Sequence, residues 1–346
     1  MHHYLRTRVN RRIILFWLGS ISYFISWSQH PVAIESMMLE QNTAPRINEL
    51  YSPKGVNLTE FVPWINALNK SYTTRESKDM DSSRNVYFSM SDSKYSGRFD
   101  EILNQSIPLG FPTAIPAMIA FDEATKEYFE IKHDVPTYLM DDASIPIGKR
   151  VMRAKFHGTL ALLIAGFNVY FGEMDIYWRS PPNASFFDSN DVEFVVSQHN
   201  NGEEINIGFY FARPTPHMIE TMERLVSFLE MPGRTTTNRN IAFDQKLFDL
   251  SVRGPSPTQQ LTVGRFSNIL NDTEKEFLKP PHQPYLNWTY LPYQVLQHWP
   301  INSMNSENLA GVHVWSGMGP PERQIDWASR CFVGKTYKDE VNSSCM

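Results

Sequence analysis

Residues 167–178 of this chain read FNVYFGEMDIYW, an apolar run that leads into two acids, Glu173 and Asp175, one residue apart. The apolar part is typical of a buried strand, and side chains two residues apart in an extended chain point the same way. We therefore expect both carboxylates to reach one small volume at the strand's end. Hard divalent cations such as Mn²⁺ and Mg²⁺ prefer oxygen ligands of this kind. A solvated strand end before the turn at Pro181 and Pro182 is the competing interpretation.

Strands and helices alternate around this stretch, which predicts an α/β fold with a mostly parallel sheet covered by helices. Ligands in such sheets bind beyond the carboxyl ends of the strands. That rule places Asp92, which follows the first strand, at the same edge as the acid pair. The expected strands are 86–90, 115–121, 135–140, 192–197, 206–212 and 310–315, and the expected helices are 122–129, 149–165 and 215–229.

Composition sets the broad class of the protein. The 346 residues are 42% hydrophobic and 20% charged, which is ordinary for a globular protein with a sizeable core. Length allows one large domain or two small ones. The formal net charge of −5 gives no support for nucleic-acid binding.

The N-terminal residues differ from the rest. Four arginines lie within residues 1–12, and the following run, 13–34, carries no charge. This pattern predicts a short cytoplasmic tail, a signal-anchor transmembrane segment over 13–34 and a luminal remainder. A cleaved signal peptide is the alternative. Residues 35–84 are predicted to form a stem with a short helix around Leu58–Leu68, ahead of a globular domain over 85–336 and a tail over 337–346.

Two further features agree with a luminal location. Cys331 and Cys345 lie close together in the sequence and are expected to form a disulfide in an oxidising compartment, with two free thiols as the alternative. Sequons for N-glycosylation, which would have to lie on the surface, occur at Asn57, Asn69, Asn104, Asn183, Asn271, Asn287 and Asn342.

Five motifs in order resemble a known family. They are a lysine-bearing helix, the acid-x-acid-x-x-Trp stretch, an Asn-x-Gly strand, an Asp-Gln pair and a Val-His strand. Over roughly residues 85–330 the chain resembles the nucleotide-diphospho-sugar transferases of glycosyltransferase family 77 type. The resemblance implies a single GT-A-like, Rossmann-like domain with a mixed, mostly parallel sheet.

The resemblance also implies roles for individual residues. The metal ligands are expected to be Glu173, Asp175 and His313. Nucleotide-sugar binding is expected of Lys155, Glu173, Gly208, Gln245 and Asp92. Catalytic roles are expected of Asp244 and Asn206. The sequence departs from the family at Glu173, where the family usually has aspartate. The longer glutamate side chain moves the charge by one methylene.

The resemblance therefore implies a Mn²⁺- or Mg²⁺-dependent glycosyltransferase, with retention of anomeric configuration as in family relatives. A UDP-linked sugar is the expected donor and a glycan or glycoprotein the expected acceptor. The expected location is the Golgi membrane, as a single-pass type II protein with the catalytic domain in the lumen. The alternative is a non-catalytic luminal protein that binds a nucleotide sugar or a glycan on the same fold.

Overall fold

The computed structural model describes residues 50–76, 84–94, 103, 106–188, 192–199, 204–230, 248, 286–298, 309–314, 323, 326, 327 and 332. The predicted tail and membrane segment over 1–34, most of the predicted stem and the predicted C-terminal tail lie outside these residues. None of the helices in the described part of the chain has the length and apolar character needed to span a bilayer.

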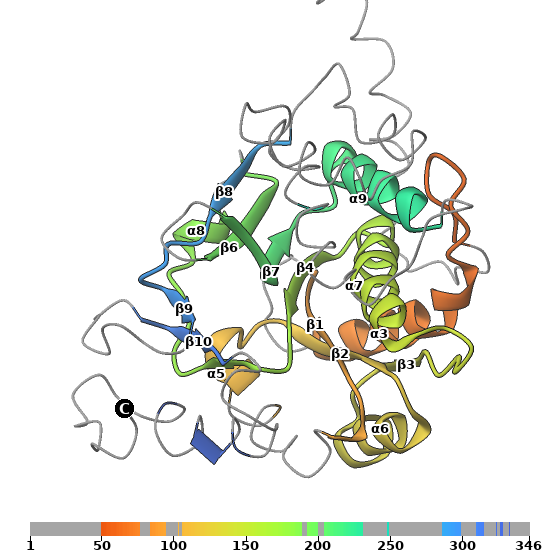
Figure 1. Ribbon diagram of the computed structural model, residues 1–346, viewed down its shortest axis with the longest axis horizontal. Helices are drawn as coiled ribbons and strands as arrows, with labels where there is room; N and C mark the ends of the chain where they lie inside the picture. The colour runs from red at the N-terminus through yellow and green to blue at the C-terminus, as the bar shows by residue number, and fades with distance from the viewer. Residues whose placement is uncertain are drawn as a thin grey trace, which may run out of the picture. The chain divides into compact units, whose positions relative to one another are not determined.

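The described residues form a seven-stranded sheet with the strand order β3-β2-β1-β4-β7-β6-β8 (Figure 1). Strands β3, β2, β1 and β4 pair in parallel, and only β7 runs antiparallel to its neighbours β4 and β6. The sheet is therefore mixed and mostly parallel, as the sequence predicts. The strands are β1 (Asn85–Ser91), β2 (Ile115–Ala120), β3 (Thr137–Leu139), β4 (Asn168–Gly172), β6 (Phe194–His199), β7 (Glu204–Ala212) and β8 (Trp288–Tyr290).

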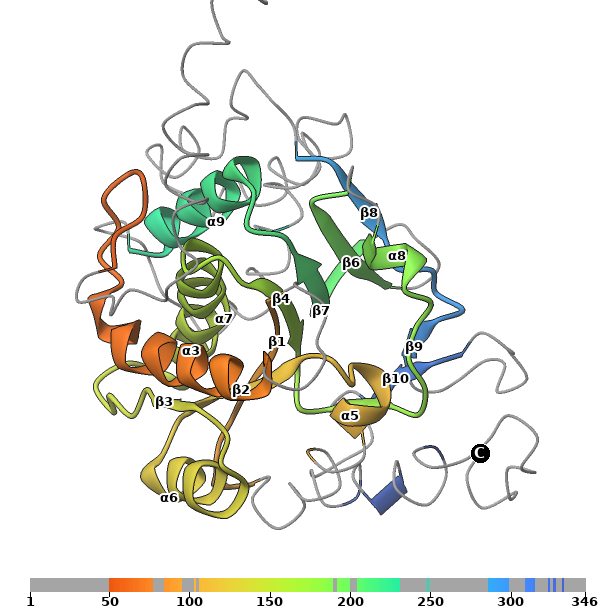
Figure 2. The same ribbon diagram turned by 180° about the vertical axis from the view of Figure 1, so that it is seen from behind.

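Both faces of this sheet are buried. Side chains alternate along each strand, so successive residues enter cores on opposite faces. Val86 and Phe88 of β1 belong to one core, with α3 (Val62–Glu76), α7 (Ile147–Ile164) and α9 (Pro216–Leu229). Tyr87 belongs to the other core, with α5 (Ile107–Gly110) and a small second sheet. Figures 1 and 2 show α3, α7 and α9 on one side of the main sheet and α5 with the small sheet on the other.

Helix α7 leads directly into the strand that precedes the acid pair. Its expected stop at Gly166 is confirmed, because Gly166 adopts a positive φ of 79°. The N–H groups of Gly166 and Phe167 donate to the carbonyls of Leu163 and Leu162, which is the pattern of a Schellman cap. This cap fixes the direction in which β4 leaves the helix.

The stretch 167–178 is two strands rather than one. Strand β4 ends at Gly172, and Ile176 begins β5 (Ile176–Trp178). The N–H of Ile176 donates to the carbonyl of Glu173 at 3.0 Å, which closes a turn between the strands. Strand β5 pairs antiparallel with β10 (Gly311–His313), and β10 pairs in parallel with β9 (Leu296–His298). This small sheet brings the late histidine to the acid pair.

Residues 50–76, which the sequence analysis placed in the stem, pack against the main sheet. The helix expected around Leu58–Leu68 is present as η1 (Thr59–Phe61) and α3. Its side chains Phe61, Trp64 and Ile65 are buried in the core that α7 and α9 share. The folded part of the chain thus includes residues ahead of the predicted boundary at 85.

The remaining short elements connect the strands. They are α6 (Glu123–Glu127), the π-helix η4 (Tyr128–Lys132) and α8 (Ser185–Asp188). Two predicted helix starts are confirmed, since Asp122 accepts a bond from the N–H of Thr125 and Thr215 accepts one from the N–H of Met218.

Candidate functional site

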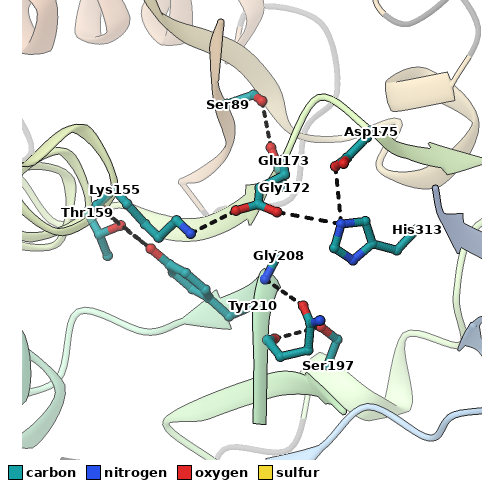
Figure 3. Close-up of polar contacts among 11 residues, drawn as sticks. Ser89, Lys155, Thr159, Gly172, Glu173, Asp175, Ser197, Gly208, Tyr210 and His313 are labelled. Carbon is teal, nitrogen blue, oxygen red and sulfur yellow. Dashed lines mark hydrogen bonds and ion pairs between the residues drawn. The ribbon is translucent and has the colours of Figure 1, made fainter. Parts of the chain in front are cut away.

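Three side chains of the kind that bind metal ions meet where β4 ends. Glu173, Asp175 and His313 each offer one ligand atom, and these atoms lie within 4.8 Å of one another. The Nε2 atom of His313 lies 3.2 Å from Asp175 Oδ1 and 3.5 Å from Glu173 Oε2 (Figure 3). Two carboxylates and one imidazole are a donor set that Mn²⁺ accepts. The residues present therefore fit a divalent cation.

Hydrogen bonds from several neighbouring strands fix the backbone of the turn between Gly172 and Ile176, which carries Glu173 and Asp175. The N–H of Glu173 donates to the carbonyl of Gly208 at 2.9 Å, and the N–H of Val314 donates to the carbonyl of Asp175 at 2.8 Å. The hydroxyl of Ser89, on β1, donates to the carbonyl of Gly172 at 2.5 Å. The carboxylates converge through this turn and not through the side-chain alternation of a continuous strand. The continuous strand expected over 167–178 is thus wrong, although both carboxylates do face one small volume.

Gly208 lies against the imidazole. A Cβ atom built on Gly208 would lie 2.5 Å from Cε1 of His313 and 2.9 Å from Oδ1 of Asn206. The ladder between β6 and β7 changes register here, since Val196 pairs with Tyr210 but Ser197 pairs with Asn206. Residues 207–209 therefore form a bulge in β7. Because Gly208 has no side chain, this bulge can lie directly against the imidazole of His313.

Asn206 supports this bulge from inside. Its Oδ1 accepts a hydrogen bond from the N–H of Gly208 at 2.7 Å, and its carbonyl accepts one from the hydroxyl of Ser197 at 2.7 Å. The side chain is buried beside His313. The structure thus brings Asn206 and Gly208 to the acid pair, and their predicted roles in catalysis and donor binding stay predictions.

Lys155 reaches the site from α7. Its Nζ lies 2.8 Å from Glu173 Oε1, and the side chain is only 2% exposed, against 28% for Glu173. Burial raises the pKa of Glu173, but the Lys155 ammonium and His313 outweigh it and hold the pKa well below its ordinary value. Glu173 is therefore ionised at neutral pH. The predicted contact of Lys155 with a donor stays a prediction.

His313 is charged when no metal is bound. Burial lowers the pKa of His313, but Asp175 and Glu173 outweigh that effect and raise the pKa to about 10. A cation that binds through Nε2 has to displace this proton, because only the neutral ring nitrogen is a ligand. Metal binding at this site would therefore be coupled to proton release.

The sequence analysis missed the residues beneath the turn. A Cβ atom at Gly172 would lie 1.9 Å from the hydroxyl oxygen of Tyr87, so only glycine fits there. The indole N–H of Trp178 donates to that hydroxyl at 3.2 Å. Ser89 and Tyr87 carry hydroxyl groups within the buried run 86–91 of β1, and that is the signal that would have found them.

Of the other predicted site residues, Asp92 directly follows β1, whose parallel neighbour β4 leads into the acid pair, and its predicted role in donor binding stays a prediction. The described contacts of Asp92 lie in its own loop, where Oδ1 accepts the N–H of Lys94 at 3.1 Å. Asp244 and Gln245, predicted for catalysis and donor binding, lie outside the described residues, as do Cys331 and Cys345.

Four of the sequons fall in the described part of the chain. Asn57, Asn183 and Asn287 are exposed. Asn69 lies within α3, where its Oδ1 accepts a bond from the guanidinium of Arg84. Asn104, Asn271 and Asn342 lie outside the described residues.

The polar side chains of the site gather beyond the carboxyl end of β4 in a mixed α/β sheet, which is where sheets of this class bind ligands. Residues 118–305 match the family model described as nucleotide-diphospho-sugar transferase. The chain belongs to that family. The match includes Glu173 and Asp175, whereas His313 follows it.

Solved structures that match the chain include glycosyltransferases. The WbbM bifunctional glycosyltransferase matches with a TM-score of 0.36 and 8% identity, over 68% of this chain and 46% of that one. Mouse xyloside xylosyltransferase 1 matches with a TM-score of 0.34 and 9% identity, over 66% of this chain and 97% of that one. This chain thus spans less than half the length of the first of them. No curated protein sequence matches it significantly.

Proposed function

We propose that the protein is a metal-dependent glycosyltransferase that moves a sugar from a UDP-linked donor to a glycan or glycoprotein acceptor. The observation that carries this proposal is the convergence of Glu173, Asp175 and His313 from two distant parts of the chain on one small volume. Family membership supplies the substrate class. The transferred sugar is a hexose or a pentose, and a screen of nucleotide-sugar donors distinguishes the two.

The roles of the residues follow from their positions. A divalent cation bound by the three side chains would act as a Lewis acid toward the donor diphosphate. Asp175 and Glu173 supply the negative charge that binds the cation, and His313 supplies a nitrogen once its proton has left. The bulge at Gly208 and Asn206 keeps the imidazole in place. Retention of anomeric configuration, with Asp244 near the acceptor and Gln245 near the donor, is part of the proposal.

We propose the Golgi membrane as the location, with residues 13–34 as the anchor and the folded domain in the lumen. The uncharged run after four arginines supports this orientation. A disulfide between Cys331 and Cys345 and glycans on the seven sequons belong to the same proposal. Glycosidase treatment of the expressed full chain tests it, because a protein made in the cytosol shows no mobility shift.

The test of the function is a screen of nucleotide-sugar donors that measures released UDP in the presence of Mn²⁺ and a panel of glycan acceptors. Asp175→Asn and His313→Gln should abolish turnover and the Mn²⁺-dependent part of UDP binding. The matched controls are Asp134→Asn, three residues before β3, and His217→Gln, half-exposed at the start of α9. Asp134 has a positive φ that asparagine tolerates. UDP binding without any metal dependence would instead favour the non-catalytic binding protein.

A further inference from the structure

We infer that Lys155 is a positioning residue for Glu173. Its ammonium binds one carboxylate oxygen and thereby directs the other oxygen toward His313 and the cation site. This inference rests on the proposed metal-dependent function, and it assigns Lys155 to the protein's own acid in place of the donor.

Lys155 is enclosed by packed side chains. Its Nζ lies 2.8 Å from Glu173 Oε1 and 5.4 Å from the centre of the Phe171 ring, a cation–π distance. The hydroxyl of Thr159 donates a hydrogen bond to the backbone carbonyl of Lys155 at 2.7 Å. The same hydroxyl oxygen lies 2.7 Å from the hydroxyl oxygen of Tyr210 (Figure 3). These contacts hold both the helix turn and the ammonium beneath Glu173.

The Glu173 carboxylate spans two partners. Oε1 faces Lys155 at 2.8 Å, and Oε2 faces Nε2 of His313 at 3.5 Å. The backbone of Glu173 is fixed by its bond to the carbonyl of Gly208. Aspartate is shorter by one C–C bond, about 1.5 Å. From the same backbone position an aspartate could not reach both Lys155 and His313. The length of the glutamate side chain therefore matches the distance between these two partners.

Direct contact between Lys155 and a donor phosphate would require a large rearrangement. The side chain is 2% exposed and already paired, so the ammonium would have to leave Glu173 and move past it. Separating a buried pair leaves an uncompensated charge, which is strongly unfavourable. The geometry therefore favours action through Glu173.

The test is Mn²⁺ binding to the full chain, measured by isothermal titration for wild type, Lys155→Met, Glu173→Gln and the double variant. Loss of a nearby positive charge alone would strengthen cation binding. Loss of positioning should instead weaken it, by about tenfold or more as for other residues that orient a metal ligand. In the Glu173→Gln background, Lys155→Met should change the affinity by less than about twofold. Lys126→Met, on the surface helix α6, is the control.

A second readout needs no metal. Lys155→Met should lower the melting temperature of the metal-free protein, and adding Glu173→Gln should restore part of the loss, because the pair is then neutral. Glu173→Asp keeps the charge and the lysine, so it tests the length match if Lys155→Met does not fold. It should lose Mn²⁺ affinity by about tenfold.

The outcomes separate the two proposals. Wild-type Mn²⁺ binding that Lys155→Met leaves unchanged or strengthens would overturn the positioning role and leave the proposed function standing. Wild-type affinity in Glu173→Asp would also overturn it. If wild type itself binds no Mn²⁺, the metal-dependent function fails and the positioning role fails with it.

Discussion

Replacing Gly208 with alanine tests whether the close approach of β7 positions His313. The new Cβ atom would lie 2.5 Å from Cε1 and 3.0 Å from Nδ1 of His313. Ordinary contacts between carbon atoms are about 3.5–4.0 Å, so the ring has to retreat by about 1 Å. Metal–ligand distances tolerate only about 0.2 Å. The displaced nitrogen would therefore leave the cation, although no ligand has been removed.

Two effects of different size follow from this displacement. Overpacking of a close-packed position costs about 1–3 kcal/mol of folding stability. Disturbing a residue that only orients a metal ligand costs about 10- to 100-fold in metal affinity. We expect Gly208→Ala to show a Mn²⁺ affinity at least about tenfold weaker than wild type, with a modest fall in melting temperature.

The assay is isothermal titration of Mn²⁺ together with thermal unfolding of the metal-free protein. Gly158→Ala is the control, because its Cβ would lie 2.8 Å from Cδ1 of Ile119, the flexible end of a core side chain. That variant adds the same methyl group inside α7 and should keep the wild-type affinity. Unchanged Mn²⁺ binding in Gly208→Ala would refute the idea that the bulge positions the imidazole.

Three further predictions concern the metal-free protein. The pKa of His313 is raised to about 10, so the stabilising contribution of its charge is fully present below about pH 6.5 and is lost as the pH rises through 10. The melting temperature of the wild type should therefore fall between these pH values, and that of His313→Gln should not. Glu223→Ala removes the acceptor of the Lys54 N–H and should cost about 1–3 kcal/mol, with faster hydrogen exchange in residues 50–58. Thr215→Ala removes the α9 cap and should cost about 1 kcal/mol in denaturant unfolding.

Much of the main sheet could be predicted because its signals are local. The strands at 86–90 and 115–121, the cap at Thr215 and the stop at Gly166 follow from apolar runs and capping residues whose effects extend over a few positions. The approach of His313 to Asp175 could be predicted only from the resemblance. No local pattern links two residues so far apart in the sequence.

The rest depended on tertiary contacts. The turn that splits 167–178 exists because β5 leaves the main sheet to pair with β10, and a strand pairing is not visible in one strand's sequence. The bulge at 207–209 likewise depends on how β6 and β4 pair with β7. Residues 50–76 resembled a stem because helix α3 has little amphipathic pattern, yet Trp64 and Ile65 are fully packed.

The small sheet has a consequence for how the protein matures. Two of the three candidate ligands emerge with β4 and its turn, but the third arrives only when β10 has been synthesised and inserted beside β5. A nascent chain can thus complete the large sheet through β7 before the proposed cation site is whole. A chain truncated before Gly311 should therefore fold these strands yet bind Mn²⁺ more weakly than the full chain.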